Sequence, residues 1–220
     1  MLLAATLVAG CGGPHIDYID FIRFNGITYV HRPAYPLLAP QYVGRRYATV
    51  KAHLQDTQND PNYQPRDGDS AFLTQGTLVY TVLGYRATFR LAAPTQTGSG
   101  YPPGYIYYEA ESVPGARTVA DWLDIRGKVV YIGINHDYAQ DTEVGSIKAP
   151  EQVRQLVDML LDTPFGPSQS TGNTSSVLLD FHLQDGTATF LPYYPDTHAI
   201  TPTLRVPLVF AAAIDAAYPH

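Results

Sequence analysis

From Arg117 onward the chain repeats one order of elements, and this repeat constrains the fold more than any other feature of the sequence. Each half of the region reads as two strands followed by one helix, which is the pattern of a ββα unit. Two such units predict one antiparallel sheet with both helices packed on one face. The expected elements are strands at residues 127–135 and 142–147, a helix at 149–166, two strands joined at Asp185-Gly186, and an Ala-rich helix that begins at Pro207.

The segment 149–166 carries the clearest helical signal. Pro150 suits the first turn of a helix, with Glu151 beside it. Apolar side chains then recur at the spacing i, i+3, i+4, i+7 and i+8, which lines one face of a helix. They are Val153, Leu156, Val157, Leu160 and Leu161. Thr163-Pro164 and Gly166 end the helix.

Residues 16–112 predict a unit of about six strands. Asn25-Gly26 lies between two short apolar runs and is a hairpin signal, and residues 47–54 alternate with the period of two that is typical of a strand. The 17 Tyr, 18 Gly and 18 Pro also favour strands and tight turns over a helical bundle. We therefore expect an α+β protein in three parts. These are a signal and flexible tether at residues 1–15, a β-rich domain at 16–112 and a ββα-ββα domain at 117–220.

Cys11, the only cysteine among the 220 residues, directly follows a short apolar run that ends in small residues. Such a run is typical of the end of a secretory signal and is too short to span a bilayer. The order Val8-Ala9-Gly10-Cys11 resembles the lipobox of bacterial lipoproteins. The resemblance implies that Cys11 becomes the mature N-terminus and carries a diacylglycerol, with further acylation of its amine, for example by palmitate. The alternative is a buried thiol, but the Gly-rich flank offers no core to bury it.

These features predict a protein anchored by lipid on the extracytoplasmic face of the cell membrane. Several acyl chains on one residue hold a protein to a membrane far better than one chain does. The lack of a second cysteine fits an exported domain that relies on its core rather than on disulfides. The net charge of −6, with Lys and Arg scattered along the chain, leaves no basic stripe for nucleic acid. The sequence predicts no cofactor.

A group of tyrosines predicts a ligand face. Exposed tyrosines stack on sugars or anchor protein contacts. The alternative is ordinary packing, because alternate residues of a strand face inward. The six are Tyr101, Tyr105, Tyr107, Tyr108, Tyr193 and Tyr194.

The polar loop at residues 56–70 offers carboxylates to a hard cation. The Ca²⁺ candidates are Asp56, Asp60, Asp67 and Asp69. The loop lacks the regular alternation and the closing Glu of an EF-hand, and turns capped by Asx residues account for the same composition. Since the seven histidines show no zinc spacing either, no definite metal site is predicted.

Gly68-Asp69-Ser70 raises a function of another class, a serine hydrolase with Ser70 as nucleophile and His198 or His182 as base. Such an enzyme needs an apolar strand before the serine and a histidine positioned by a carboxylate. The residues before Ser70 read as a polar loop instead, so no catalytic residue is predicted.

A resemblance covers most of the chain. The segments that carry it are the lipobox, residues 20–29, 76–80 with Gly84-Tyr85, Tyr108-Glu109-Ala110, 151–161 and 181–188. With these segments the chain resembles bacterial lipoproteins of unknown function from actinomycete-type or other Gram-positive-type envelopes. The resemblance implies no activity and assigns no catalytic residue.

Together these observations predict a lipid-anchored, non-enzymatic binding or scaffolding protein of the cell envelope. Its expected partners are the membrane, through the lipid on Cys11, and an envelope protein or cell-wall component. Two alternatives stay open. One is a ligand-binding protein for Ca²⁺ or a glycan, and the other is the hydrolase that uses Ser70.

Overall fold

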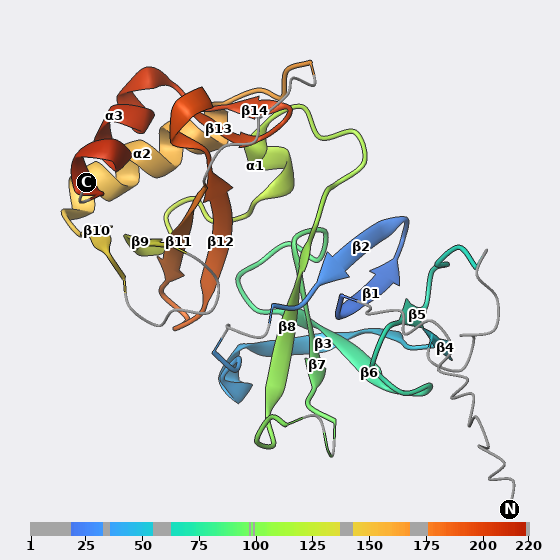
Figure 1. Ribbon diagram of the computed structural model, residues 1–220. Coiled ribbons are helices and arrows are strands. Elements are labelled where there is room, and N and C mark those ends of the chain that lie inside the picture. The colour runs from blue at the N-terminus through green and yellow to red at the C-terminus, as the bar shows by residue number, and fades with distance from the viewer. Residues whose placement is uncertain are drawn as a thin grey trace, which may run out of the picture.

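The computed structural model describes residues 19–32, 36–54, 63–96, 98, 100–136, 143–167 and 176–218. Figure 1 shows one sheet built from the N-terminal part of the chain and a second sheet, with the helices beside it, built from the C-terminal part. Strands predominate over helices, and the α+β class expected from the sequence is confirmed.

The first sheet has eight strands within the described residues, and all neighbouring strands run antiparallel except β4 and β5. In order across the sheet they are β3 (Val43–Thr49), β6 (Leu78–Val82), β7 (Arg90–Pro94), β8 (Tyr105–Ala110), β2 (Ile27–Val30), β1 (Phe21–Phe24), β5 (Asp69–Ser70) and β4 (Ala52–His53). A short 3₁₀ helix, η1 (Pro40–Tyr42), leads into β3. The count exceeds the six strands expected, because β4 and β5 are two residues long and too short to give a periodic signal.

The segment 47–54 is divided between the two edges of this sheet, so the prediction of one continuous strand is wrong. Val50 N donates to Thr77 O at 2.9 Å, beside β6, whereas Lys51 N donates to Gly68 O at 2.8 Å, beside β5. Since β3 and β4 stand at opposite ends of the strand order, the sheet curls until its edges meet at these two residues.

The tight turn predicted at Asn25-Gly26 is confirmed. β1 and β2 pair antiparallel up to Phe24 and Ile27, on either side of the turn. Asn25 and Gly26 both have positive φ, 52° and 74°, as a type I′ turn requires. The hairpin therefore forms where the local sequence alone specifies it.

The second sheet has four antiparallel strands within the described residues, and the tandem ββα pattern is present in it. The strand order is β10 (Gly145–Ile147), β9 (Val129–Asn135), β11 (Val177–Leu183) and β12 (Ala188–Tyr193). The helices are α1 (Val119–Trp122), α2 (Pro150–Asp162) and α3 (Leu208–Ala217). The sequence pattern did not anticipate the 3₁₀ helix η3 (Pro195–Thr197) and the hairpin of β13 (Ala199–Thr201) and β14 (Leu204–Arg205), which precede α3.

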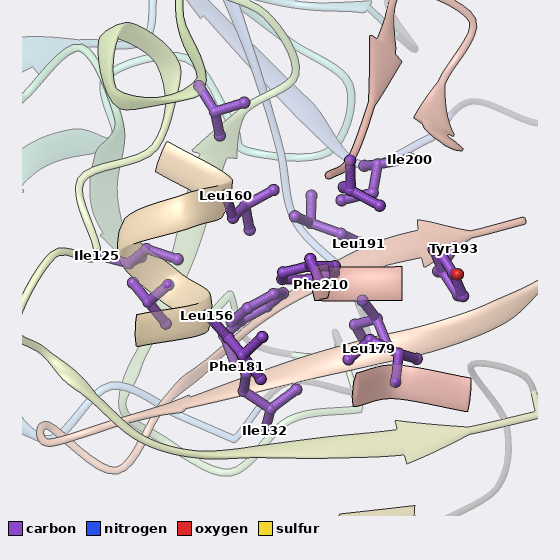
Figure 2. Close-up of a cluster of buried hydrophobic side chains, with 14 of the residues drawn as sticks. Ile125, Ile132, Leu156, Leu160, Leu179, Phe181, Leu191, Tyr193, Ile200 and Phe210 are labelled. Carbon is purple, nitrogen blue, oxygen red and sulfur yellow. The ribbon is translucent and has the colours of Figure 1, made fainter. Parts of the chain in front are cut away.

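The core of the C-terminal part lies between this sheet and its helices. Figure 2 shows Ile132 and Phe181 of the sheet beside Leu156 of α2 and Phe210 of α3. The five apolar residues predicted to line the inner face of the 149–166 helix are all buried. The helix is shorter than predicted at its end, because it stops at Asp162, just before the Thr163-Pro164 pair.

Candidate functional site

Arg90, in β7, is fully buried and joins the first sheet to the β11–β12 hairpin of the second. The rings of Tyr85 and Tyr107 lie 4.7 and 4.5 Å from its guanidinium carbon. Its guanidinium donates to Glu109 Oε1, Thr187 Oγ1, Ala188 O and Thr189 Oγ1 at 2.5 to 3.1 Å. A buried guanidinium with this many partners fixes the relative position of the two sheets.

A groove runs along the junction of the two sheets, beside α1 and the β13–β14 hairpin. Figure 1 shows these two elements close together above β2 and β8. We call it the seam groove. The volume of its central part is about 280 Å³. The residues that line this part include Glu111, Val113, Trp122, Phe165, Thr201 and Thr203.

Two further hollows share lining residues with the central part of the seam groove. Toward β12, Trp122 and Thr201 also line a hollow of about 180 Å³ that reaches Arg32. Toward β14, Thr203 also lines a hollow of about 160 Å³ that reaches Arg205. The shared residues place both hollows beside the central part of the seam groove.

Trp122 is held in a fixed orientation at the centre of the seam groove. Thr118 and Asp121 form a capping box at the start of α1, which supports this single helical turn. The indole Nε1 of Trp122 donates to Ala110 O at 2.7 Å. The ring centroid lies 6.3 Å from that of Phe165, at an interplanar angle of 43°. Since the indole N–H is already occupied, a ligand meets the apolar ring of Trp122.

The chemistry of the seam groove is mainly apolar with a few oxygen groups. Glu111 is exposed, and the Oγ1 atoms of Thr201 and Thr203 lie 3.2 Å apart. Among the described residues that line the central part, there is no Lys, Arg or His. Aromatic rings next to a few polar groups are typical of small-molecule sites. This lining favours a ligand with both C–H faces and hydroxyl groups over an anion.

A second polar cluster lies on the outer face of the four-stranded sheet, opposite α2 and α3. Asn135 Nδ2, from β9, donates to Asp180 Oδ2, from β11, at 2.7 Å. His182 Nε2 lies 2.9 Å from Glu143 Oε1, close enough for an ion pair though not aligned for a hydrogen bond. The ring of Tyr131 stacks on the imidazole of His182 at 4.0 Å. We call these five residues the outer-face cluster.

Burial shifts the ionisation of the outer-face cluster. It raises the pKa of Asp180 to about 7, and the negative charge of Glu143 adds to this rise. Burial lowers the pKa of His182, an effect that the Glu143 carboxylate opposes. Burial and a hydrogen bond to Glu143 raise the pKa of Tyr131 to about 12.

The six tyrosines predicted as a ligand face do not share one exposed face. Tyr107, Tyr108 and Tyr193 are 0% exposed, because they pack in the cores of the two sheets. Tyr107 and Tyr108 are consecutive in β8 and therefore point to opposite faces. The partly exposed members are Tyr101, Tyr105 and Tyr194, and Tyr101 contacts His31 Nε2 through its hydroxyl at 3.2 Å.

The Ca²⁺ candidates fall partly outside the described residues, where Asp56 and Asp60 lie. Asp67 accepts hydrogen bonds from Gly26 N at 2.9 and 3.2 Å. Asp69 is buried and accepts from Tyr63 Oη at 2.8 Å and from Arg66 N at 2.6 Å. In the part of the chain that is described, these two carboxylates therefore stabilise turns.

Ser70 is 0% exposed, and its Oγ accepts a hydrogen bond from Leu73 N at 2.9 Å. His182 belongs to the outer-face cluster on the other sheet, and His198 follows η3 with a left-handed backbone, φ 49°. The described structure thus records no hydrogen bond from Ser70 to either histidine, and the hydroxyl is not open to a substrate. Cys11 lies outside the described residues.

Comparison of the chain with protein-family models, curated proteins and solved structures found no match. Across the described ranges, no helix has both the length and the apolar character needed to cross a membrane. In those same ranges, no three His, Cys, Asp or Glu side chains are grouped to hold a metal ion.

Apart from His182, named above as a possible base for Ser70, no residue of the seam groove or of the outer-face cluster is predicted as a site from the sequence. Trp122 is the single tryptophan of the chain, and that rarity is a usable signal. Asp180 interrupts the apolar run Val177–Leu183, which was also a signal, because a carboxylate inside a buried strand needs an explanation. The closeness of Asn135 and Glu143 to Asp180 is a tertiary feature that no local pattern predicts.

Proposed function

We propose that this protein is a lipid-anchored binding protein without enzymatic activity on the extracytoplasmic face of a bacterial cell membrane, and that it binds a short neutral cell-wall glycan in the seam groove. The proposal joins the anchor expected at Cys11 with the seam groove at the junction of the two sheets.

The observation that carries the binding half of the proposal is the fixed Trp122 ring next to Phe165 in the seam groove. A sugar ring presents C–H groups on its faces and hydroxyls at its edge. The faces suit the aromatic rings, while Glu111, Thr201 and Thr203 offer hydrogen-bond partners for the hydroxyls. The two adjoining hollows, which reach Arg205 and Arg32, offer space for a second sugar unit beside the one at Trp122.

The anchor half of the proposal rests on the order Val8-Ala9-Gly10-Cys11. Residues 12–18 separate Cys11 from Ile19, the first residue of the described part. A lipid on Cys11 would hold the folded part near the membrane surface while leaving the seam groove open to the cell wall.

Replacement of Cys11 by serine tests the anchor. The Cys11→Ser variant should move from the membrane fraction of the expressing cells to the soluble fraction, because serine accepts no thioether-linked lipid. Gly13→Ala is the matched control and should stay with the membrane. Retention of Cys11→Ser in the membrane fraction, at the level of the control, would contradict the anchor.

Replacement of Trp122 tests the groove. Trp122→Ala should weaken the binding of cell-wall oligosaccharides about tenfold or more, as removal of a central aromatic contact does. Trp122→Phe keeps an aromatic ring, so its affinity for the oligosaccharides should fall less than that of Trp122→Ala. Phe72→Ala, at an aromatic side chain that is 41% exposed in the N-terminal part, is the matched control. Equal affinities for Trp122→Ala and Phe72→Ala, measured by calorimetry on folded protein, would contradict binding in the seam groove.

A further inference from the structure

The outer-face cluster contains two buried oxygen atoms without a partner. Asp180 and Asn135 are each 5% exposed. Their hydrogen bond to each other uses Asp180 Oδ2 and Asn135 Nδ2, so the Oδ1 atom of each residue is left over. Neither Oδ1 atom has a hydrogen-bond partner in the described structure. Buried polar atoms are almost always paired with protein, water or an ion, so these two acceptors call for a group that donates or carries positive charge.

The carboxylate of Glu143 lies close to Asp180, at the pair of residues that Asp180 forms with Gly133 across the β9 and β11 strands. Gly133 lies opposite Asp180 in the β9–β11 register. A Cβ atom on Gly133 would lie 2.5 Å from Glu143 Oε1 and 2.8 Å from Glu143 Cδ. The carboxylate of Glu143 therefore occupies the space above Gly133, next to Asp180. Any larger residue at position 133 would displace it.

Two neighbouring side chains hold Glu143 in place. The hydroxyl of Tyr131 hydrogen bonds to its carboxylate, and His182 Nε2 contacts it at 2.9 Å. The ring of Tyr131 is itself held between the imidazole of His182, at 4.0 Å, and Lys148 Nζ, at 5.3 Å. The carboxylate is thus positioned before any ligand arrives, which lowers the entropic cost of binding.

We propose that Asp180, Asn135 and Glu143 form a binding site for a hard divalent cation of the Ca²⁺ type. The donors are all oxygen atoms, which such cations prefer, and Ca²⁺ takes carboxylate, amide and water oxygens in flexible geometry. Two carboxylates and one amide oxygen make a small set, so water completes the coordination. None of these three residues lies in the acidic loop at residues 56–70 or lines the central part of the seam groove.

Charge gives a second reason for a cation. The Glu143 carboxylate lies over Gly133, which is opposite Asp180 in the β9–β11 register, so two carboxylates face the same part of the sheet. The basic side chains that face them are His182, whose Nε2 lies 2.9 Å from Glu143 Oε1, and Lys148, which lies over Tyr131. A bound divalent cation would offset the repulsion between the two carboxylates and pair both free Oδ1 atoms.

Calorimetric titration of the full chain with CaCl₂ tests the proposal, with thermal melts in Ca²⁺ and in EDTA as a second readout. The wild-type protein should show saturable binding at one site and a higher melting temperature in Ca²⁺. Asp180→Asn should abolish both. Gly133→Ala, which displaces Glu143 but leaves Asp180 in place, should weaken binding at least tenfold. Asp67→Asn in the acidic loop is the matched control and should bind as the wild type does.

Three outcomes overturn the cation site. They are the absence of saturable heat with wild-type protein, full binding by Asp180→Asn, and loss of binding in Asp67→Asn alone. If Asp180→Asn does not fold, the Ca²⁺ affinity of Gly133→Ala is the deciding measurement. An affinity equal to that of the wild type overturns the proposal. Glycan binding in the seam groove should be the same in Asp180→Asn as in the wild type, so failure of one proposal is distinguishable from failure of the other.

Discussion

Asp180 and Arg90 are both buried ionisable residues, but their surroundings differ in kind. The guanidinium of Arg90 has carboxylate, hydroxyl and carbonyl partners on two sheets. The carboxyl of Asp180 has one hydrogen bond, from Asn135, and a free Oδ1 atom. A fully paired buried charge stabilises one arrangement of the chain. A buried charge with an unpaired oxygen atom destabilises the fold unless a ligand pairs with that atom. Such groups are typical of functional sites.

The ionisation of Asp180 predicts how the stability of the protein depends on pH. Burial raises the pKa of Asp180 from its ordinary value of 3.8 to about 7. Between about pH 4 and pH 7 the folded state therefore holds a proton that the unfolded state has lost, so the free energy of unfolding falls as the pH rises through this window. In Asp180→Asn this contribution is absent.

Urea unfolding in EDTA at pH 5 and pH 8 measures the effect. The stability of Asp180→Asn relative to the wild type should rise by on the order of 2 kcal/mol between the two pH values. Asp162→Asn, at an exposed carboxyl of α2, is the control and should change little. The same stability difference at both pH values would show that Asp180 is ionised in the folded protein throughout.

At the scale of secondary-structure elements, Arg90 connects β7 and β8 to the turn between β11 and β12. Arg90→Met should lower the free energy of unfolding by about 3 to 5 kcal/mol, because the variant leaves the carboxylates of Glu109 and Asp185 buried beside an apolar side chain. Arg126→Met removes an exposed arginine that pairs with Asp158 and Asp162, and it should cost about 1 kcal/mol or less. Urea unfolding compares the two variants, and equal losses would contradict a joining role for Arg90.

The sequence predicts those elements that depend on a short stretch of residues, namely one amphipathic helix and two hairpins. The apolar periodicity of residues 149–166 gave α2, and the turn residues Asn25-Gly26 and Asp185-Gly186 gave two hairpins. The break between β3 and β4 has no such signal, because residues 47–54 keep their alternation while the backbone partners change at Val50. The pairing of β4 with β5 likewise depends on tertiary contacts between short segments.

Single residues such as Trp122 carry a signal in the sequence, but the assembled seam groove could not be predicted from it. The seam groove combines Trp122 with Phe165 and with Thr201, residues far apart in the chain that the tertiary packing of the C-terminal part brings together. The tyrosine face was expected from composition, but composition does not distinguish a core tyrosine from an exposed one. Tyr107 illustrates this, since its hydroxyl donates to Ala188 O at 2.8 Å inside the junction with the second sheet.

At the scale of the whole molecule, the two sheets form one body whose junction carries the proposed function. Arg90 holds the sheets together on one side of the junction, while α1, β8 and the β13–β14 hairpin leave the seam groove open on another. The outer-face cluster lies on the face of the second sheet away from α2 and α3. The two proposals thus assign a glycan to the seam groove and a cation to the outer-face cluster, and the proposed anchor is the lipid on Cys11.

The most direct test of the central proposal uses Trp122, the only tryptophan of the chain, as an internal reporter. Its fluorescence should be measured on Cys11→Ser protein during titration with neutral cell-wall oligosaccharides of increasing length. Our account predicts a saturable change in emission with at least one oligosaccharide, and tighter binding as the length grows to fill the seam groove. Oligosaccharide binding that calorimetry detects without any change in Trp122 emission would contradict it, as would the absence of binding across the whole series.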